Sequence, residues 1–181
     1  MIYCGVGFLP ENFGKPDRPR SWIQAINRLT TLPENFGNLE NLRNLYLTSN
    51  ILTSLPQNFG NLKNLERVDL RLNNLTSLTQ NIGNLENLQE IYLISNKLTS
   101  LPETIGNLTS LKELNLKGNN LSSLPGTFSD LRSLEVLNLE GNPLITLSNL
   151  SSNLLRIAKF SGIRLTQKGS LLYRTHHFEL L

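Results

Sequence analysis

Cysteine and histidine are scarce in this chain of 181 residues, which has one cysteine and two histidines. The single cysteine, Cys4, cannot form an internal disulfide or build a zinc site alone, so disulfide-stapled scaffolds and cysteine-based zinc fingers are excluded. No apolar run approaches the roughly 18 residues that a membrane helix needs, which excludes a transmembrane protein. The first ten residues lack the basic start and apolar stretch of a secretory signal, so the sequence by itself predicts a cytoplasmic protein.

Catalytic motifs are also absent. The sequence contains no phosphate-binding loop, nucleophile elbow, zinc-protease helix or dinucleotide-binding glycine pattern. His176 and His177 are adjacent near the C-terminus and far in sequence from Cys4, so both a cysteine–histidine dyad and a histidine metal site are disfavoured. We therefore expect a protein that is not an enzyme, with no catalytic residue, no cofactor and no metal.

The net charge of +3 comes from the C-terminal end. Residues 28–150 have nine Lys and Arg against eleven Asp and Glu, whereas residues 151–181 have five Lys and Arg against one Glu. Cations spread this thinly are typical of a solvated end, so we expect no membrane insertion.

Two sequence blocks recur with a period of 23 residues. The first block has the form L-P-E-N-F-G, and the second has the form L-x-x-L-x-L-x-x-N-x-L. The first starts at Leu9, Leu32, Leu55, Leu78, Leu101 and Leu124, and the second at Leu42, Leu65, Leu88, Leu111 and Leu134. The apolar–polar alternation of the second block predicts a short strand with inward leucines, and the proline of the first predicts an irregular or 3₁₀ return segment.

One repeat of this kind cannot bury its own leucines, so we expect the repeats to stack into a solenoid. The strands would form a parallel sheet on the concave face, and the return segments would form the convex side. The first block also predicts an apolar residue that fills the convex core, followed by a glycine that suits a positive φ or close packing of coils. These residues are Phe13, Phe36, Phe59, Ile82, Ile105 and Phe128, and Gly14, Gly37, Gly60, Gly83 and Gly106.

An asparagine recurs where each strand is expected to turn away from the sheet. A buried amide at such a position must be satisfied by neighbouring backbone groups, so we interpret these residues as a structural ladder and not as catalytic groups. The ladder residues are Asn27, Asn50, Asn73, Asn96, Asn119 and Asn142.

The full pattern L-P-x-x-F/I-G-N-L-x-N-L resembles the leucine-rich repeat family, and in particular bacterial proteins of the leptospiral leucine-rich repeat type. The resemblance covers residues 9–147. It implies an α/β-type solenoid, the leucine-rich repeat horseshoe, that serves as a protein-interaction scaffold, often at a host–pathogen boundary. It also implies an exported or surface-associated protein, whereas the sequence alone suggests a cytoplasmic one.

The repeat pattern divides the chain into three parts: divergent, uncapped N-terminal repeats over 1–27, regular repeats over 28–147, and a C-terminal cap with a basic tail over 148–181. In the first part, Pro19 and Gln24 replace inward leucines while Trp22 can still fill an inward site, which indicates either a divergent repeat or two compensating frameshifts. The absence of a polar cap predicts homodimers through residues 1–27. Apolar and basic residues over 153–160 predict a short capping helix.

The outward positions of the strands form the candidate interaction surface. Five basic and six acidic residues alternate there, whereas a nucleic-acid surface would be a basic stripe, so nucleic-acid binding is disfavoured. Tyrosine and arginine are the residue types that carry interface energy, and outward apolar residues can exclude water from an interface. The candidate partner-binding residues are Tyr46, Arg67, Asp69, Arg71, Leu72, Glu90, Tyr92 and Ile94.

These observations predict a non-enzymatic scaffold that binds a protein partner of unknown identity on its concave face. Two alternatives stay open from the sequence. Tyrosine platforms beside Asp and Asn also suit a carbohydrate or extracellular-matrix binding module, and the broken repeat over 15–26 suits a degenerate repeat protein without a dedicated partner.

Overall fold

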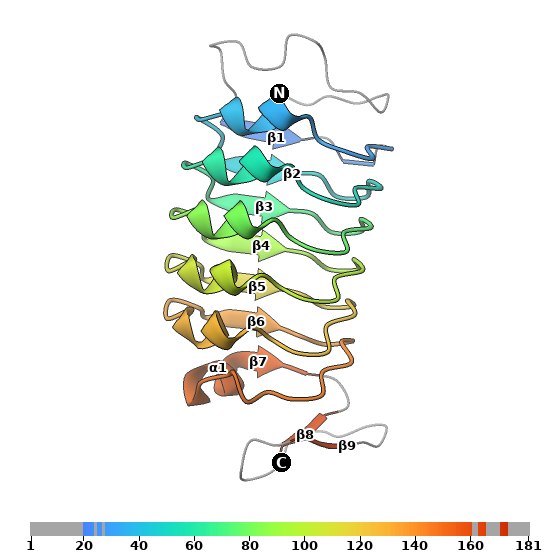
Figure 1. The fold of residues 1–181 in the computed structure, drawn as a ribbon, viewed down its shortest axis with the longest axis vertical. Helices are drawn as coiled ribbons and strands as arrows, with labels where there is room; N and C mark the ends of the chain where they lie inside the picture. The colour runs from blue at the N-terminus through green and yellow to red at the C-terminus, as the bar shows by residue number, and fades with distance from the viewer. Residues whose placement is uncertain (1–19, 24, 27, 161–162, 166–170, 174–181) are drawn as a thin grey trace.

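The main feature of the fold is a seven-stranded parallel sheet whose strands follow one another in sequence order. The computed structural model describes residues 20–23, 25–26, 28–160, 163–165 and 171–173. The strands are β1 (Ser21–Ile23), β2 (Asn44–Tyr46), β3 (Arg67–Asp69), β4 (Glu90–Tyr92), β5 (Glu113–Asn115), β6 (Val136–Asn138) and β7 (Ala158–Lys159). Each strand from β1 to β5 pairs with the residues 23 positions further along, so one repeat makes one coil of the stack in Figure 1. This confirms the expected solenoid with a concave parallel sheet.

A short 3₁₀ helix lies on the convex side of each of five described coils. The helices are η1 (Glu34–Asn38), η2 (Gln57–Asn61), η3 (Gln80–Asn84), η4 (Glu103–Asn107) and η5 (Gly126–Asp130). A proline precedes four of them, and its fixed φ near −65° sets the entry into the turn. Thr79 takes this place before η3, where its hydroxyl accepts a hydrogen bond from the Asn81 N–H at 3.3 Å. A side-chain cap thus replaces the proline in that coil.

The core between the sheet and the 3₁₀ helices consists mainly of buried leucines. The expected convex residues Phe36, Phe59, Ile82, Ile105 and Phe128 are all buried, and Phe13 lies outside the described residues. The rings of Phe36 and Phe59 stack across two coils with centroids 6.4 Å apart. Because each coil buries its leucines only against its neighbours, stability depends on the stacking of coils.

The asparagine ladder is present in every coil where its residue is described. Asn96 shows the pattern: its Oδ1 accepts from the Leu75 N–H at 3.0 Å, and its Nδ2 donates to the Leu70 carbonyl at 2.9 Å and the Leu93 carbonyl at 3.1 Å. Leu70 and Leu75 belong to the preceding coil, so the amide ties two coils together. Asn50, Asn73, Asn119 and Asn142 are likewise buried and hydrogen-bonded, and Asn27 lies outside the described residues.

The recurring glycines serve close packing and not a positive φ. A Cβ on Gly83 would lie 2.3 Å from the backbone oxygen of Thr104, and Gly37, Gly60 and Gly106 face the next coil in the same way. Among the described glycines, φ is positive only at Gly118 and Gly141. Of the two roles predicted for these glycines, close packing is therefore confirmed and the positive φ is wrong. Gly14 lies outside the described residues.

The first described coil keeps the register of the others despite its unusual sequence. Trp22 is buried at the inward position of β1, opposite Leu45, and Ser21 pairs with Asn44. The N–H groups of Arg43 and Asn44 both donate to the Arg20 carbonyl. Pro19, Gln24 and most of residues 1–27, with the homodimer contact predicted there, lie outside the described residues.

The C-terminal coil corrects one sequence prediction. The capping helix α1 covers Ser152–Ile157 and does not reach residue 160. Ser151 caps its N-terminus, because the Ser151 hydroxyl accepts a hydrogen bond from the Leu154 N–H at 3.4 Å. Residues 158–159 form β7 instead, because the Lys159 carbonyl accepts from the Leu139 N–H at 2.9 Å and so extends the sheet by one strand. An antiparallel pair follows, β8 (Ile163–Leu165) and β9 (Leu171–Tyr173). His176 and His177 lie outside the described residues.

Candidate functional site

The concave face is a grid of side chains, because the strands are in register and equivalent residues stand one strand spacing apart, about 4.8 Å. All eight candidate partner-binding residues lie on three adjacent coils of this face, the coils of β2, β3 and β4. The four outward columns read Arg43, Glu66, Gln89, Lys112 and Glu135; Asn44, Arg67, Glu90, Glu113 and Val136; Tyr46, Asp69, Tyr92, Asn115 and Asn138; and Thr48, Arg71, Ile94, Lys117 and Glu140.

Ion pairs between neighbouring coils order the long side chains of the grid. Arg67 pairs with Glu90 at 2.9 Å and Lys117 pairs with Glu140 at 2.8 Å, and Arg43 pairs with Glu66 in the same arrangement. Each partner keeps about a third to a half of its side chain exposed, so such a pair contributes about 0–1 kcal/mol to stability. Their main effect is to hold the charged groups in fixed positions across the face.

Tyr92 lies at the centre of the densest cluster. The guanidinium carbon of Arg67 is 5.1 Å from the centroid of the Tyr92 ring, and that of Arg71 is 5.8 Å away. The hydroxyl accepts from Arg67 Nη2 at 3.1 Å and lies 2.9 Å from one oxygen each of Glu90 and Glu113, to either of which it can donate its proton. Burial, followed by the hydrogen bonds with Glu113 and Glu90, raises the pKa of the Tyr92 hydroxyl above its ordinary value, so it stays a neutral donor.

Asp69 is buried beneath this cluster and holds Arg71 in place. Arg71 Nε donates to Asp69 Oδ1 at 2.9 Å and Arg71 Nη2 donates to Oδ2 at 2.6 Å, while the side chain of Asp69 is only 5% exposed. Burial alone would raise the pKa of Asp69, but hydrogen bonds from Arg71 and Thr48 outweigh it and lower that pKa. Asp69 thus acts on the surface through Arg71 and not as an open contact.

The acid sensitivity of the fold provides a test of this buried pair. The lowered pKa means that ionised Asp69 stabilises the fold above the ordinary carboxyl pKa of about 4, and that this contribution is lost as the pH falls through the lower folded-state pKa. We expect the urea midpoint of the wild type to fall more steeply below about pH 4 than that of Asp69→Asn. Glu86→Gln, at an exposed position, serves as the control and should follow the wild type. Equal slopes for the wild type and Asp69→Asn would contradict this role.

The remaining candidate residues form the border of the cluster. Tyr46 is half-buried on β2, opposite Asp69 in the strand register. Leu72 is 53% exposed and its N–H donates to the Ile94 carbonyl at 2.9 Å, so the two apolar residues adjoin on neighbouring coils. The structure therefore brings all eight predicted residues into one region, with Asp69 beneath it.

Glu113 is a member of the cluster that the sequence prediction missed. It stands opposite Glu90 in the register of β4 and β5, and both carboxylates approach the Tyr92 hydroxyl. Two like charges on adjacent coils are unfavourable unless another group separates or bridges them. The adjacent glutamates in one column, next to a tyrosine, were the signal in the sequence.

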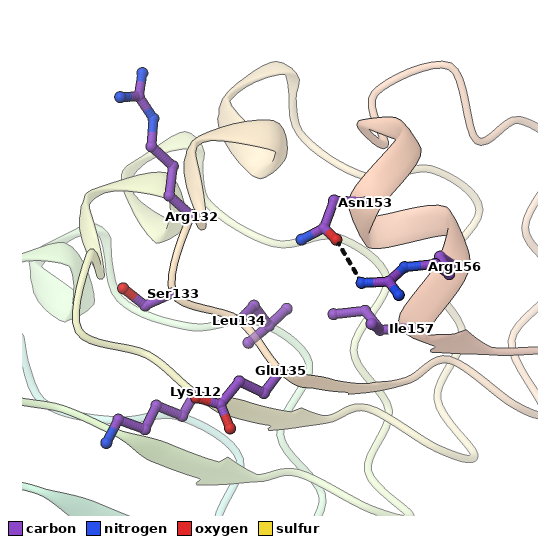
Figure 2. Close-up of a pocket in the computed structure, with 8 residues that line it drawn as sticks. All are labelled: Lys112, Arg132, Ser133, Leu134, Glu135, Asn153, Arg156 and Ile157. Atoms are coloured by element: carbon purple, nitrogen blue, oxygen red, sulfur yellow. Dashed lines mark hydrogen bonds between the residues drawn. The ribbon is translucent and has the colours of Figure 1, made fainter.

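A second feature is an open depression of about 520 Å³ between α1 and the coils of β5 and β6 (Figure 2). Its lining residues are Lys112, Arg132, Ser133, Leu134, Glu135, Asn153, Arg156 and Ile157. Arg156 Nη2 donates to Asn153 Oδ1 at 3.2 Å, whereas Figure 2 shows Arg132 directed away from the other side chains.

Neither a metal-binding cluster nor a membrane-spanning helix occurs in the described part of the chain. Three or more His, Cys, Asp or Glu side chains that could hold a metal do not come together there. No helix in that part has the length and apolar character needed to cross a membrane.

Comparison with known proteins gives a consistent result. A family model described as "Leucine rich repeat" matches residues 40–98, 63–121 and 86–144. No match is found among curated proteins. Among solved structures, a leucine-rich repeat protein of Leptospira interrogans is similar over 86% of this chain and 42% of its own, with 34% identity and a TM-score of 0.76.

Two further solved structures are similar. InlP of Listeria monocytogenes is 32% identical over 77% of this chain and 38% of its own, with a TM-score of 0.66. The leucine-rich repeat ectodomain of the plant membrane receptor kinase GASSHO1/SCHENGEN3 from Arabidopsis thaliana, in complex with CASPARIAN STRIP INTEGRITY FACTOR 2, is 30% identical over 69% of this chain and 18% of its own, with a TM-score of 0.52. This chain therefore spans less than half the length of each of these similar proteins.

Proposed function

The chain belongs to the leucine-rich repeat family, and from this membership we propose that it is a non-enzymatic scaffold that binds a protein partner on its concave face. Folds of this family are typical of protein-interaction scaffolds, and one of the similar structures is a complex. We also propose host proteins as candidate partners, because similar structures come from Leptospira interrogans and Listeria monocytogenes.

The observation that carries the proposal is the packing of Arg67 and Arg71 against the Tyr92 ring, next to the exposed Leu72. Tyrosine and arginine are enriched among the few residues that dominate binding energy at protein interfaces, where surrounding contacts exclude water from them. Here both arginines and the tyrosine are held by bonds within the chain, so their rotamers are fixed before a partner arrives. A preordered surface loses less conformational entropy on binding.

The charges of the face indicate how a partner would be selected. Arg67 and Arg71 already pair with Glu90 and Asp69, so they are ordered donors with remaining N–H groups and not isolated charges that seek a counterion. A carboxylate or carbonyl of the partner that accepts from them completes an existing network. Because opposite charges alternate on the face, a partner with a mismatched charge pattern would place like charges opposite one another. This arrangement favours specificity over affinity.

The alternatives left open by the sequence have weaker support. A sugar ring stacks on a free aromatic face, whereas the Tyr92 ring already has two guanidinium groups beside it. A degenerate repeat protein would be expected to lose ladder residues, whereas the ladder amides of Asn50, Asn73, Asn96, Asn119 and Asn142 are all buried and bonded.

Affinity capture with a surface variant tests the proposal. The immobilised chain is incubated with lysate of the producing organism and, separately, with extracellular host proteins, beside the variant Tyr46→Ala, Arg67→Ala, Tyr92→Ala. We expect a partner that the wild type retains and that the variant binds at least tenfold more weakly, because truncation of interface anchors commonly costs about 2 kcal/mol or more each.

The matched control changes three exposed residues of the convex side, Asn61→Ala, Asn84→Ala and Glu86→Ala, and should bind as the wild type does. Circular dichroism confirms that all variants are folded. A partner bound equally by the wild type and the concave variant would contradict the proposal. Binding to a glycan array with no captured protein would instead favour the carbohydrate alternative.

A further inference from the structure

In six of the described coils, the backbone position directly before the ladder asparagine has a positive φ. Its residues are Ile26, Ser49, Leu72, Ser95, Gly118 and Gly141, with φ between 55° and 68°. Glycine adopts this conformation without strain, whereas a bulky residue is unfavourable there and a β-branched one is a clear outlier. Gly118 and Gly141 show that the fold accepts residues without a side chain at this position. Ile26 and Leu72 therefore occupy it against the local backbone preference.

These two side chains are also among the most exposed large apolar residues of the described chain. Ile26 is 84% exposed and Leu72 is 53% exposed, and Ile51, 41% exposed, lies on the coil between them. Ile94 adjoins Leu72 on the next coil. We call these four residues the exit ridge, because they lie where successive strands leave the concave sheet. Neither backbone preference nor core packing accounts for apolar side chains at Ile26 and Leu72.

The flank of the solenoid that bears the exit ridge has no acidic residue among its described positions. These positions are 26, 28–31, 49–54, 72–77, 95–100, 118–123 and 141–146, which are rich in Asn, Ser and Thr. Its charged residues are Arg28 and Lys97, both exposed, and Arg71 borders it at the concave face. The carboxylates of the regular repeats lie on the concave columns or on the convex side. The ridge is thus apolar surface in a setting of positive or no charge.

We propose that the exit ridge is a docking site for a segment of another protein that presents apolar side chains flanked by carboxylates. The apolar side chains would cover Ile51 and Leu72, and the carboxylates would face Arg28 and Lys97, which have no acidic neighbour on this flank. A bulky residue with a positive φ at an exposed position is expected where the residue is retained for function and not for stability. The ridge is distinct from the Tyr92 cluster, although Leu72 and Ile94 border both.

A peptide selection with stability measurements tests this proposal. Phage-displayed random 12-residue peptides are selected on the intact chain, and the selected peptides are synthesised as probes. We expect them to combine Leu, Ile or Phe with Asp or Glu, and to bind the double variant Ile51→Asn, Leu72→Asn at least tenfold more weakly than the wild type. Ile145→Asn changes an isoleucine outside the ridge that is 58% exposed, and it should leave their affinity unchanged.

Unfolding measurements separate a functional residue from a structural one. Asparagine tolerates a positive φ, so we expect Leu72→Asn to keep or raise the urea midpoint while it weakens peptide binding. A lowered midpoint would show that Leu72 serves the fold and would overturn the proposal. Peptides without acidic residues, no selected peptide, or equal binding to the double variant would also overturn it.

Two more readouts distinguish the exit ridge from a self-association surface and from the concave cluster. Self-association of the wild type in light scattering that is absent in Leu72→Asn would assign the ridge to a second copy of the chain and overturn the proposal. Tyr92→Ala should leave peptide binding within twofold of the wild type, because Tyr92 belongs to the concave cluster. Loss of peptide binding in Tyr92→Ala would place the peptides on the concave face instead and would overturn this proposal. The proposed function is tested by partner capture on the concave face, so the two proposals are contradicted by different results.

Discussion

Replacing Asn96 with alanine is expected to lower the free energy of unfolding by about 3–5 kcal/mol. The substitution leaves the buried Leu75 N–H without its acceptor and removes the donor to the Leu70 and Leu93 carbonyls. Each buried polar group without a partner costs about 1–3 kcal/mol, and the three groups span two coils. The ladder would therefore be broken at the centre of the stack, where a coil depends on both neighbours. Urea denaturation followed by circular dichroism measures the change.

The exposed Asn84 provides the control for Asn96→Ala. Asn84 lies at the end of η3 with its side chain in solvent, so Asn84→Ala should change the free energy of unfolding by less than about 0.5 kcal/mol. If the Asn96→Ala and Asn84→Ala variants had the same free energy of unfolding, the buried amides would not tie the coils together.

Replacing Gly83 with alanine is the second substitution with a large expected effect, a loss of about 3 kcal/mol. The new Cβ would lie 2.3 Å from the Thr104 backbone oxygen and 2.8 Å from the Thr104 Cβ, and neither atom can move unless the next coil moves. Overpacking of this kind costs about 1–3 kcal/mol, and a rigid backbone contact places it at the upper end. The variant thus measures how tightly the convex sides of two coils are packed.

Gly126 offers a matched glycine with free space. A Cβ there would meet only the flexible end of Glu103, at 3.7 Å, and φ is not positive. Gly126→Ala should therefore keep or raise stability, by about 0.4–1 kcal/mol, because alanine reduces the entropy of the unfolded chain. The same urea titration compares the two variants. If Gly83→Ala were as stable as Gly126→Ala, the claim that the coils at Gly83 and Thr104 lie too close for a Cβ would be contradicted.

The period of 23 residues made most of the fold predictable from the sequence. Stacked coils must repeat the same inward positions, so the leucines, the convex residues such as Phe59 and ladder residues such as Asn96 could all be assigned from spacing alone. The proline of the first block predicted an irregular or 3₁₀ return segment, although η3 forms with Thr79 in its place. The end of α1 could not be predicted, because residues 158–159 pair with β6, a tertiary contact with no local signal.

The candidate site could be predicted only as a set of columns. Spacing placed Tyr92 and Arg67 on the concave face, but it could not show that Arg71 would fold back over Asp69 and bury it, or that Glu113 would reach the Tyr92 hydroxyl. These contacts depend on side-chain rotamers and not on sequence position. The positive φ of Leu72 was equally hidden, because leucine has no preference for that conformation.

Site-specific photo-crosslinking tests the central claim, that the concave face binds a protein partner, most directly. A photoreactive amino acid replaces exposed Lys112 of the concave face in one sample and exposed Asn84 of the convex side in another. Both samples are mixed with the captured partner and irradiated. We expect a crosslinked complex from position 112 that the change Arg67→Ala, Tyr92→Ala abolishes, and none from position 84. Crosslinking from position 84 alone would contradict the account.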